Sequence, residues 1–292
     1  TNPTSTVLYK SEIALKAGNA IVFSPHPNAL HCILETVKVI RQAISEAGGN
    51  ENLVSCITIP TMEATDNLMR HRDVTMILAT GGAAMVRAAY MSGTPAIGVG
   101  PGNGPAYLEK TCDLKLAVKR VLDSKTFDNG LICASEQSVI CDEDMASVVR
   151  EEMERQGAYF LTDVENKKLG RYILRANGTM NPEIVGRSVS TICALAGLDN
   201  VPAGKKVLVA RETGVGRGHP YSNEKLAPIP AFFTGRDYRD VCEKACELLH
   251  YEGAGHTFSI HTQDEKMVDY FARRVPASRV LVNTPSSLGG IG

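Results

Sequence analysis

The residue with the clearest chemical potential in this sequence is Cys133, which lies in the stretch TFDNGLICASEQ (126–137). An amphipathic helical pattern precedes this stretch and a β-like run, 138–141, follows it, so the cysteine falls in a connection between two elements. Asn129-Gly130 is a strong turn signal. A thiol in such a connection can lie partly exposed, near backbone N–H groups that favour its nucleophilic thiolate. The alternative is a small core residue, because free cysteine is often buried.

Three other polar side chains are candidates for a catalytic or binding site. Asn2 precedes a helical pattern, Glu224 precedes a β-like run, and His256 follows a glycine before another strand. Each also has an ordinary structural explanation. Asn2 could be the N-cap of its helix, Glu224 an exposed charge and His256 a turn residue.

Candidate nucleotide contacts follow predicted strands in the first third of the chain. Strands are predicted at 20–23, 53–57, 75–79 and 95–99, and helices at 29–47, 62–71 and 83–91. This alternation predicts a parallel sheet with helices on its faces, and such sheets bind ligands beyond the carboxyl ends of their strands. The candidate residues at those ends are Ser24, Pro25, His26, Thr80, Gly81, Gly82 and Gly100. Taken alone, the glycines would be ordinary turn residues.

The glycine-rich segment GVGPGNGP (98–105) predicts a boundary between two α/β domains, 1–104 and 105–292. In the second domain, helices are predicted at 114–122, 143–156, 165–174, 189–195, 237–250 and 264–273. Strands are predicted at 138–141, 206–210, 258–261 and from 279 onward. The charged helices 143–156 and 165–174 are expected to present solvated outer faces.

Composition bounds the class of protein. The 292 residues suggest about two domains, and 43% hydrophobic with 22% charged residues is ordinary for a globular protein. Lys and Arg number 31 against 32 Asp and Glu, so no global field favours nucleic acid or an anionic membrane. No apolar run approaches ~18 residues and no secretory leader is visible, so no membrane span is expected.

The cysteine and glycine spacings exclude several site types. Eight cysteines are scattered, without a CxxC pair or a Cys/His cluster, so we expect no metal site and a reducing, cytoplasmic compartment. Cys242 and Cys246 are expected to pack on one helix face. The glycines at 214, 216 and 218 lack the spacing of a dinucleotide-binding turn and predict a surface loop. The chain opens without Met and ends on LGGIG (288–292), which predicts a piece of a longer protein.

The Cys133 stretch resembles the nucleophile segment of the aldehyde dehydrogenase superfamily, an Asn-x-Gly-x-x-Cys-like signature after a Phe. Its letters FDNGLICASEQ (127–137) are similar to the CoA-acylating branch, which includes the aldehyde half of bifunctional alcohol/aldehyde dehydrogenases. The resemblance extends over the whole chain. It implies a Rossmann-type cofactor domain, partial here, followed by an α/β catalytic domain, in a chain that lacks both family ends.

The resemblance also implies roles for the candidate residues. Cys133 would be the nucleophile, and the side chain of Asn2 with the backbone N–H of Cys133 would form an oxyanion hole. His256 lies in a Gly-His-Thr triplet that resembles one near the active site of the acylating branch. Glu224 lies in NEKLAPI (223–229), which resembles the Glu-x-Phe-Gly-Pro segment whose Glu hydrogen-bonds the nicotinamide ribose.

The same resemblance assigns the strand-end residues to a dinucleotide. Ser24, Pro25 and His26 would hold the adenosine ribose, and Thr80 with the two glycines after it would face the pyrophosphate. Many hydrolytic members carry a Lys in the first of these segments and this chain does not. The resemblance implies NAD as the cofactor, and the missing Lys leaves NADP open.

The glycines of 98–100 stand where hydrolytic relatives carry a water-activating Glu. Without that base, a thiol is the better acyl acceptor. We therefore expect an NAD-dependent enzyme that converts a small aldehyde and CoA to acyl-CoA, reversibly, as a homo-oligomer. Acetaldehyde is the default substrate, and an anionic aldehyde would need a cation such as Arg211 or Arg217. The alternatives are a hydrolytic aldehyde dehydrogenase and an inactive module with a role in assembly.

Overall fold

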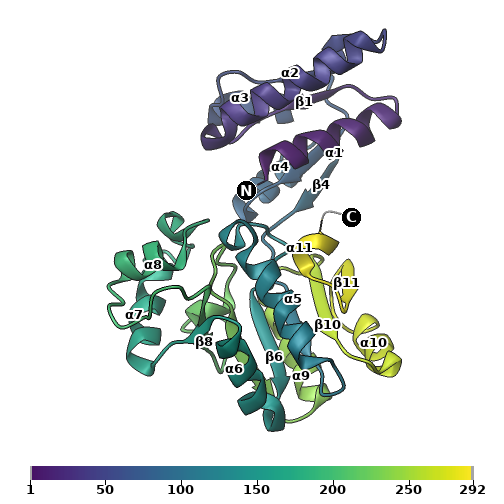
Figure 1. Ribbon diagram of the computed structural model, residues 1–292. Coiled ribbons are helices and arrows are strands. Elements are labelled where there is room, and N and C mark those ends of the chain that lie inside the picture. The colour runs from purple at the N-terminus through teal and green to yellow at the C-terminus, as the bar shows by residue number, and fades with distance from the viewer. Residues whose placement is uncertain (1, 291–292) are drawn as a thin grey trace. The chain divides into compact units, whose positions relative to one another are not determined.

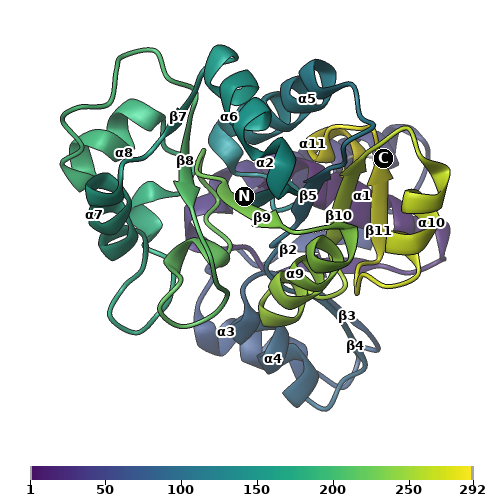
Figure 2. The same cartoon turned by 90° about the horizontal axis from the view of Figure 1, so that it is seen from below.

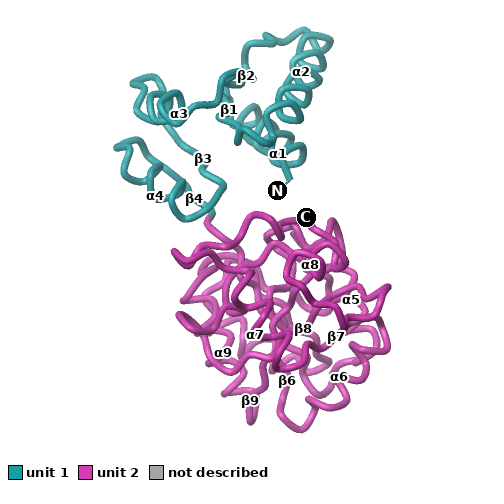
Figure 3. Tube along the Cα trace, turned by 90° about the vertical axis from the view of Figure 1, so that its left-hand side faces the viewer, with its two compact units in different colours: residues 1–99 teal, residues 100–292 magenta. Residues whose placement is uncertain are grey.

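The computed structural model describes residues 2–290 of the chain. The chain folds into two compact units, residues 1–99 and 100–292 (Figure 3). The division lies inside the glycine-rich segment 98–105, a few residues before the predicted boundary at Gly104. Within the described part of the chain, no helix is long and apolar enough to cross a bilayer.

The first unit consists of two βαβ-like pairs of parallel strands. Its helices are α1 (Pro3–Lys16), α2 (Leu30–Glu46), α3 (Met62–Met69) and α4 (Ala83–Met91). Its strands are β1 (Ile21–Phe23), β2 (Val54–Cys56), β3 (Ile77–Thr80) and β4 (Ala96–Val99). β1 pairs with β2 and β3 with β4, both in parallel. The predicted strands are therefore present, but as two separate two-stranded sheets rather than one.

The second unit contains a seven-stranded sheet of parallel strands (Figure 1). The order of its strands is β11-β10-β5-β6-β9-β8-β7. The strands are β5 (Pro105–Leu108), β6 (Ser138–Asp142), β7 (Ala158–Phe160), β8 (Val207–Arg211), β9 (Ala231–Gly235), β10 (Thr257–His261) and β11 (Arg279–Val282). The helices are α5 (Leu114–Thr126), α6 (Ala146–Arg155), α7 (Asp163–Ile173), α8 (Val189–Ala196), α9 (Tyr238–Tyr251), α10 (Glu265–Ala272) and α11 (Ser286–Gly289).

Both faces of this sheet are covered by a hydrophobic core. Successive side chains of a strand point to opposite faces, so each strand contributes to both cores. On the central strand β6, Val139 and Cys141 join the core under α5 and α6, whereas Ile140 joins the core under α9. Figure 2 shows α5 and α6 on one side of the sheet and α9 on the other. The predicted solvated helices 143–156 and 165–174 are amphipathic, and each buries one face against the sheet.

Capping side chains fix several helix starts. Asp113 accepts a hydrogen bond from the Leu116 N–H at the start of α5, at 3.0 Å. Thr162 and Glu165 form a reciprocal capping box at α7. The cap at Asp113 fixes the residue at which α5 begins. The last turn of α5 leads directly into the Cys133 stretch.

Replacing Val139 by Ala should destabilise the second unit by roughly 2–3 kcal/mol, because the fully buried side chain would leave a cavity under α5. Val148→Ala is the matched control, since Val148 is 43% exposed on α6 and should change the free energy of unfolding by at most about 0.5 kcal/mol. Urea unfolding measures both. Equal losses in the two variants would contradict the proposed packing of β6.

Candidate active site

Cys133 lies in a tight connection between α5 and β6. Asp128, Asn129 and Gly130 all have positive φ, at 48°, 51° and 73°, in the left-handed region that costs non-glycine residues free energy. The space at Gly130 is closed as well, because an added Cβ would lie 2.7 Å from the carbonyl oxygen of Ala227. The Cys133 side chain is half-buried, in agreement with the predicted partial exposure.

Cys133, His256 and Gly102 meet at the amino edge of the seven-stranded sheet. They precede β6, β10 and β5, which are adjacent parallel strands. An added Cβ at Gly102 would lie 2.0 Å from the carbonyl oxygen of Cys133 and 3.2 Å from Cε1 of His256. Only glycine therefore fits where the 100–104 segment passes between the cysteine turn and the imidazole.

Glu224 joins the same group through the backbone. Its Oε1 accepts a hydrogen bond from the Gly102 N–H at 2.8 Å, and its own N–H donates to Oε2 of Glu252 at 2.6 Å. Burial raises the pKa of Glu224 to about 7, the Gly102 N–H lowers it, and the Glu252 carboxylate raises it. The alternative explanation of Glu224 as an exposed charge is therefore wrong, because its carboxylate is partly buried and takes up a proton near neutral pH.

The expectation that the surroundings of Cys133 favour its thiolate is wrong. Burial and then the Glu224 carboxylate raise the pKa of the thiol. A backbone N–H and Arg279 lower the pKa, as expected for such a turn, but burial and Glu224 outweigh them. The thiol of Cys133 is therefore protonated at neutral pH, and it would have to lose its proton in order to act as a nucleophile.

His256 is the third titratable group at this edge. Burial, with the Arg279 guanidinium, lowers the pKa of its imidazole, so the ring is neutral at neutral pH. Nδ1 lies 3.0 Å from the Thr257 hydroxyl, and its backbone N–H donates to Gly253. The predicted turn role and a role at the site are thus both compatible with its position.

The candidate nucleotide contacts of the first unit lie where the sequence predicts them. Ser24, Pro25 and His26 directly follow β1, and Ser24 Oγ lies 2.7 Å from Thr65 Oγ1. Thr80 is the last residue of β3, and Gly82 is the N-cap of the nine-residue helix α4. Nothing lies within 4 Å of an added Cβ at Gly82 or at Gly100. Open glycines at strand ends and at a helix N-terminus suit a pyrophosphate.

Asn2 is the N-cap residue of α1, yet its side chain does not cap the helix backbone. Its amide nitrogen donates to Ser5 Oγ at 3.2 Å. The capping explanation for Asn2 therefore has no hydrogen bond in its support, and its proposed catalytic role stays a prediction.

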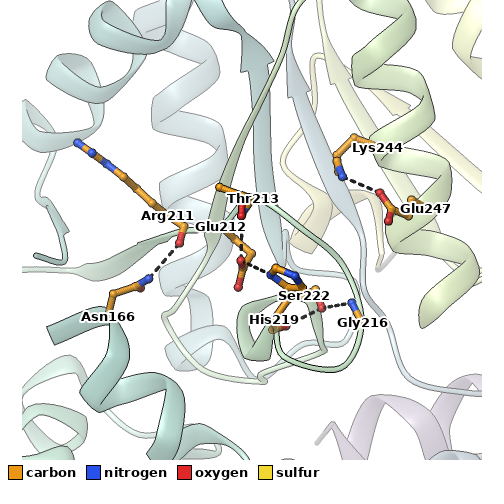
Figure 4. A network of polar contacts seen from close by, with 9 residues as sticks. All are labelled: Asn166, Arg211, Glu212, Thr213, Gly216, His219, Ser222, Lys244 and Glu247. Atoms are coloured by element: carbon orange, nitrogen blue, oxygen red, sulfur yellow. Dashed lines mark hydrogen bonds and ion pairs between the residues drawn. The ribbon is translucent and has the colours of Figure 1, made fainter. Parts of the chain in front are cut away.

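Polar contacts connect the residues of the loop after β8 (Figure 4). Glu212 Oε1 lies 2.7 Å from His219 Nδ1, and Ser222 Oγ accepts from the Gly216 N–H at 3.0 Å while donating to the His219 carbonyl at 2.7 Å. An added Cβ at Gly214 would overlap the His219 ring. The glycines of 214–218 thus serve the folding of the loop, and the exposed Arg217 lies among them.

The other seven cysteines range from exposed to buried. All eight are free thiols. Cys242 is buried and Cys246 packs against the same core from α9, which confirms the predicted helix-face packing. In residues 2–290, no three His, Cys, Asp or Glu side chains are grouped to hold a metal ion.

Sequence reasoning missed three buried polar residues that hydrogen bonds join to one another, namely Lys125, Gln137 and Lys225. A signal for Lys125 was present, because it follows the apolar positions 118, 121 and 122 at helical spacing. That spacing places Lys125 on the buried face of α5. Gln137 and Lys225 lie inside stretches already noted for Cys133 and Glu224.

Replacing Glu224 by Gln should lower the pKa of Cys133, because it removes the carboxylate that raises it. Alkylation by iodoacetamide follows the thiolate fraction, so the pH profile of Cys133 labelling should move to lower pH. Peptide mass spectrometry measures this rate. Glu151→Gln, at an exposed position of α6, is the control and should leave the profile unchanged. An unshifted profile in Glu224→Gln would show that the Glu224 carboxylate does not raise the pKa of Cys133.

The chain is similar to known aldehyde dehydrogenases over its whole length. The model of the aldehyde dehydrogenase family matches residues 2–163. A crystal structure of a probable aldehyde dehydrogenase from Listeria monocytogenes is 58% identical with a TM-score of 0.97, and the match covers 100% of this chain and 64% of that one. The propionaldehyde dehydrogenase of Rhodopseudomonas palustris with bound propionyl-CoA is 32% identical with a TM-score of 0.89, over 100% of this chain and 64% of that one.

The bifunctional aldehyde-alcohol dehydrogenase of Escherichia coli is 45% identical over 100% of this chain and 33% of its own length. The chain therefore spans about a third of that relative and about two thirds of the solved structures. The family match covers more than half of the 292 residues, and the half-buried Cys133 in its tight turn agrees with it. This chain belongs to the aldehyde dehydrogenase family.

Proposed function

We propose that the protein is an NAD-dependent, CoA-acylating aldehyde dehydrogenase, which converts a small aldehyde and CoA to acyl-CoA in a reversible reaction. One observation carries this proposal: residues 100–104, which pack against Cys133, are glycine, proline and asparagine, so the segment 98–104 itself supplies no carboxylate to activate water. The carboxylate that does reach this segment, Glu224, is bound to the Gly102 N–H and is assigned to the nicotinamide ribose. The relative with bound propionyl-CoA supports a thiol as acyl acceptor.

Cys133 would attack the aldehyde carbon through its sulfur and form a thiohemiacetal. The backbone N–H of Cys133 and the side-chain amide of Asn2 would stabilise the oxyanion. NAD, when bound, supplies the hydride acceptor that turns this adduct into a thioester. The thiol of CoA then attacks the thioester carbon, and the sulfur of Cys133 leaves.

His256 and Glu224 are the two groups that can move the required protons. In the tautomer of His256 that carries its hydrogen on Nδ1 and donates it to Thr257 Oγ1, Nε2 is the nitrogen that can take the proton of an attacking thiol. Glu224, with a pKa of about 7, can exchange a proton near neutral pH. In the same proposal Glu224 binds the nicotinamide ribose as a carboxylate.

The dinucleotide would lie along the strand ends of the first unit. Ser24, Pro25 and His26 would contact the adenosine ribose, and Thr80, Gly81, Gly82 and Gly100 would allow the pyrophosphate close to the backbone. NADP is the alternative cofactor. We further propose a cytoplasmic homo-oligomer, since eight free thiols suit a reducing compartment. Acetaldehyde is the simplest candidate substrate.

Turnover should depend on CoA. Water attacks a thioester poorly without a base, and general-base help is typically worth ~10²–10⁴-fold. The enzyme at its natural length is supplied with acetaldehyde and NAD, with and without CoA, while NADH and the product are followed. We expect acyl-CoA and CoA-dependent NADH. Sustained NADH without CoA, with an equal amount of carboxylate, would place the protein among hydrolytic enzymes.

Cys133→Ala should lower turnover by at least ~10³-fold, because it removes the covalent nucleophile. Its binding of NAD, measured by calorimetry, should stay within about threefold of the parent. Cys141→Ala is the control, since that thiol is buried under α5. Loss of turnover in the control alone would exclude Cys133 as the nucleophile.

A further inference from the structure

Two lysines of the second unit are buried without an ion pair. Lys125, in the last turn of α5, is 0% exposed, and Lys225, beside Glu224, is 1% exposed. Within residues 2–290, neither ammonium lies within 4 Å of a carboxylate. Lys125 Nζ donates to Ser135 Oγ at 3.4 Å and Gln137 Oε1 at 3.2 Å, and Lys225 Nζ donates to the carbonyls of Tyr221 and Asn223.

Such an arrangement is unfavourable for folding, because each buried ammonium has lost its water without gaining an opposite charge. Burial lowers the pKa of Lys125 to about 7 and the pKa of Lys225 well below its ordinary value. Lysine is almost never fully buried unless it is paired. Residues that lower stability in this way concentrate at functional sites.

Gln137 connects the two lysine segments. Its Oε1 accepts from Lys125 Nζ and also from the backbone N–H of Lys225 at 3.1 Å. Its own backbone N–H donates to the Gly104 carbonyl at 2.9 Å. One glutamine thus joins the end of α5, the glycine segment that passes Cys133, and the segment that carries Glu224.

The Lys125 side chain contacts the 130–137 turn, which carries the thiol of Cys133. Its partner Ser135 Oγ also donates to the Gly130 carbonyl at 3.4 Å, and a Cβ added at Gly130 would lie 3.1 Å from the Lys125 carbonyl oxygen. The ammonium therefore contacts the end of the 130–137 turn, and Cys133 lies in the middle of that turn.

We infer that Lys125 is a positioning residue of the proposed reaction, whose buried ammonium holds the Cys133 turn in register with the Glu224 segment through Ser135 and Gln137. This inference rests on the proposed function. It assigns Lys125 no contact with substrate, and its effect passes through the two residues that the reaction uses.

Charge gives the inference a measurable consequence. Among the groups that face Glu224, Lys125 and Lys225 lower its pKa and Glu252 raises it. Glu136 and Glu224 in turn raise the pKa of Lys125. Removing the Lys125 ammonium should raise the pKa of Glu224, so that the carboxylate is lost at higher pH as the solution is acidified. On acidification, any binding step that needs the carboxylate should therefore begin to weaken at a higher pH in the variant than in the parent enzyme.

Lys125→Met tests the inference in the enzyme at its natural length. Ser135 and Gln137 each keep a second partner, so the melting temperature should stay the same or rise. We expect kcat to fall at least tenfold, with the acid limb of the NAD affinity shifted to higher pH. Lys119→Met, at an exposed position on the same helix, should change neither. A variant with unchanged kcat and an unshifted limb would overturn the inference.

Gln137 supplies a second test of the same link. Gln137→Glu keeps the acceptor oxygen and should retain at least a third of kcat, whereas Gln137→Met should lose at least tenfold. The double variant Lys125→Met/Gln137→Met should lose little more kcat than the worse of its two single variants, because both substitutions remove the same contact between Lys125 and Gln137. Multiplied losses, or equal effects of Glu and Met at 137, would contradict it.

These readouts separate the inference from the proposed function. If the parent enzyme formed no acyl-CoA, the proposed function would fail. Iodoacetamide labelling of Cys133 would still report on the turn, and Lys125→Met should change its rate at least threefold. If the parent were active and both kcat and labelling were unchanged by Lys125→Met, only the inference would fail.

Discussion

The close approach of Gly102 to the carbonyl of Cys133 is the constraint on which the proposed site depends. A side chain at position 102 would overlap that carbonyl and press on His256, so the cysteine turn can seat only against glycine. The same residue holds the Glu224 carboxylate through its N–H. Because β5, β6 and β10 are adjacent and parallel, the segments that precede them reach one edge of the sheet, and the chemistry gathers there.

Burial controls the electrostatics of this edge. It raises the pKa values of Cys133 and Glu224 and lowers those of His256 and Lys125. Each shift favours the neutral form. A site of neutral groups can exchange protons with little rearrangement of charge, which suits a cycle in which one thiol attacks and another leaves. Lys225 follows the same rule, because burial lowers its pKa as well. The positioning role inferred for Lys125 gives a reason why that buried lysine is retained.

The sequence was most informative where apolar spacing is regular. It predicted α2, α4 and α9 to within about two residues, but it missed β5 and β7 and gave no bounds for β9, the strand expected after Glu224. Prolines precede or open β5 and β9, and β7 has only three residues, too few for a periodic pattern. The turn of Cys133 was also predictable from Asn129-Gly130. The protonation of its thiol was not, because it depends first on burial and then on Glu224, which folding brings close from far along the chain.

The central claim is that Cys133 carries an acyl group between aldehyde and CoA. Incubating the enzyme with acetyl-CoA, without any dinucleotide, isolates this step, because thioester exchange with Cys133 releases free CoA and needs no hydride. Intact and peptide mass spectrometry then locate the adduct. We predict one acetyl group per chain, on Cys133, removed again by added CoA. An adduct on another residue, or no adduct with a correctly folded protein, would contradict the account.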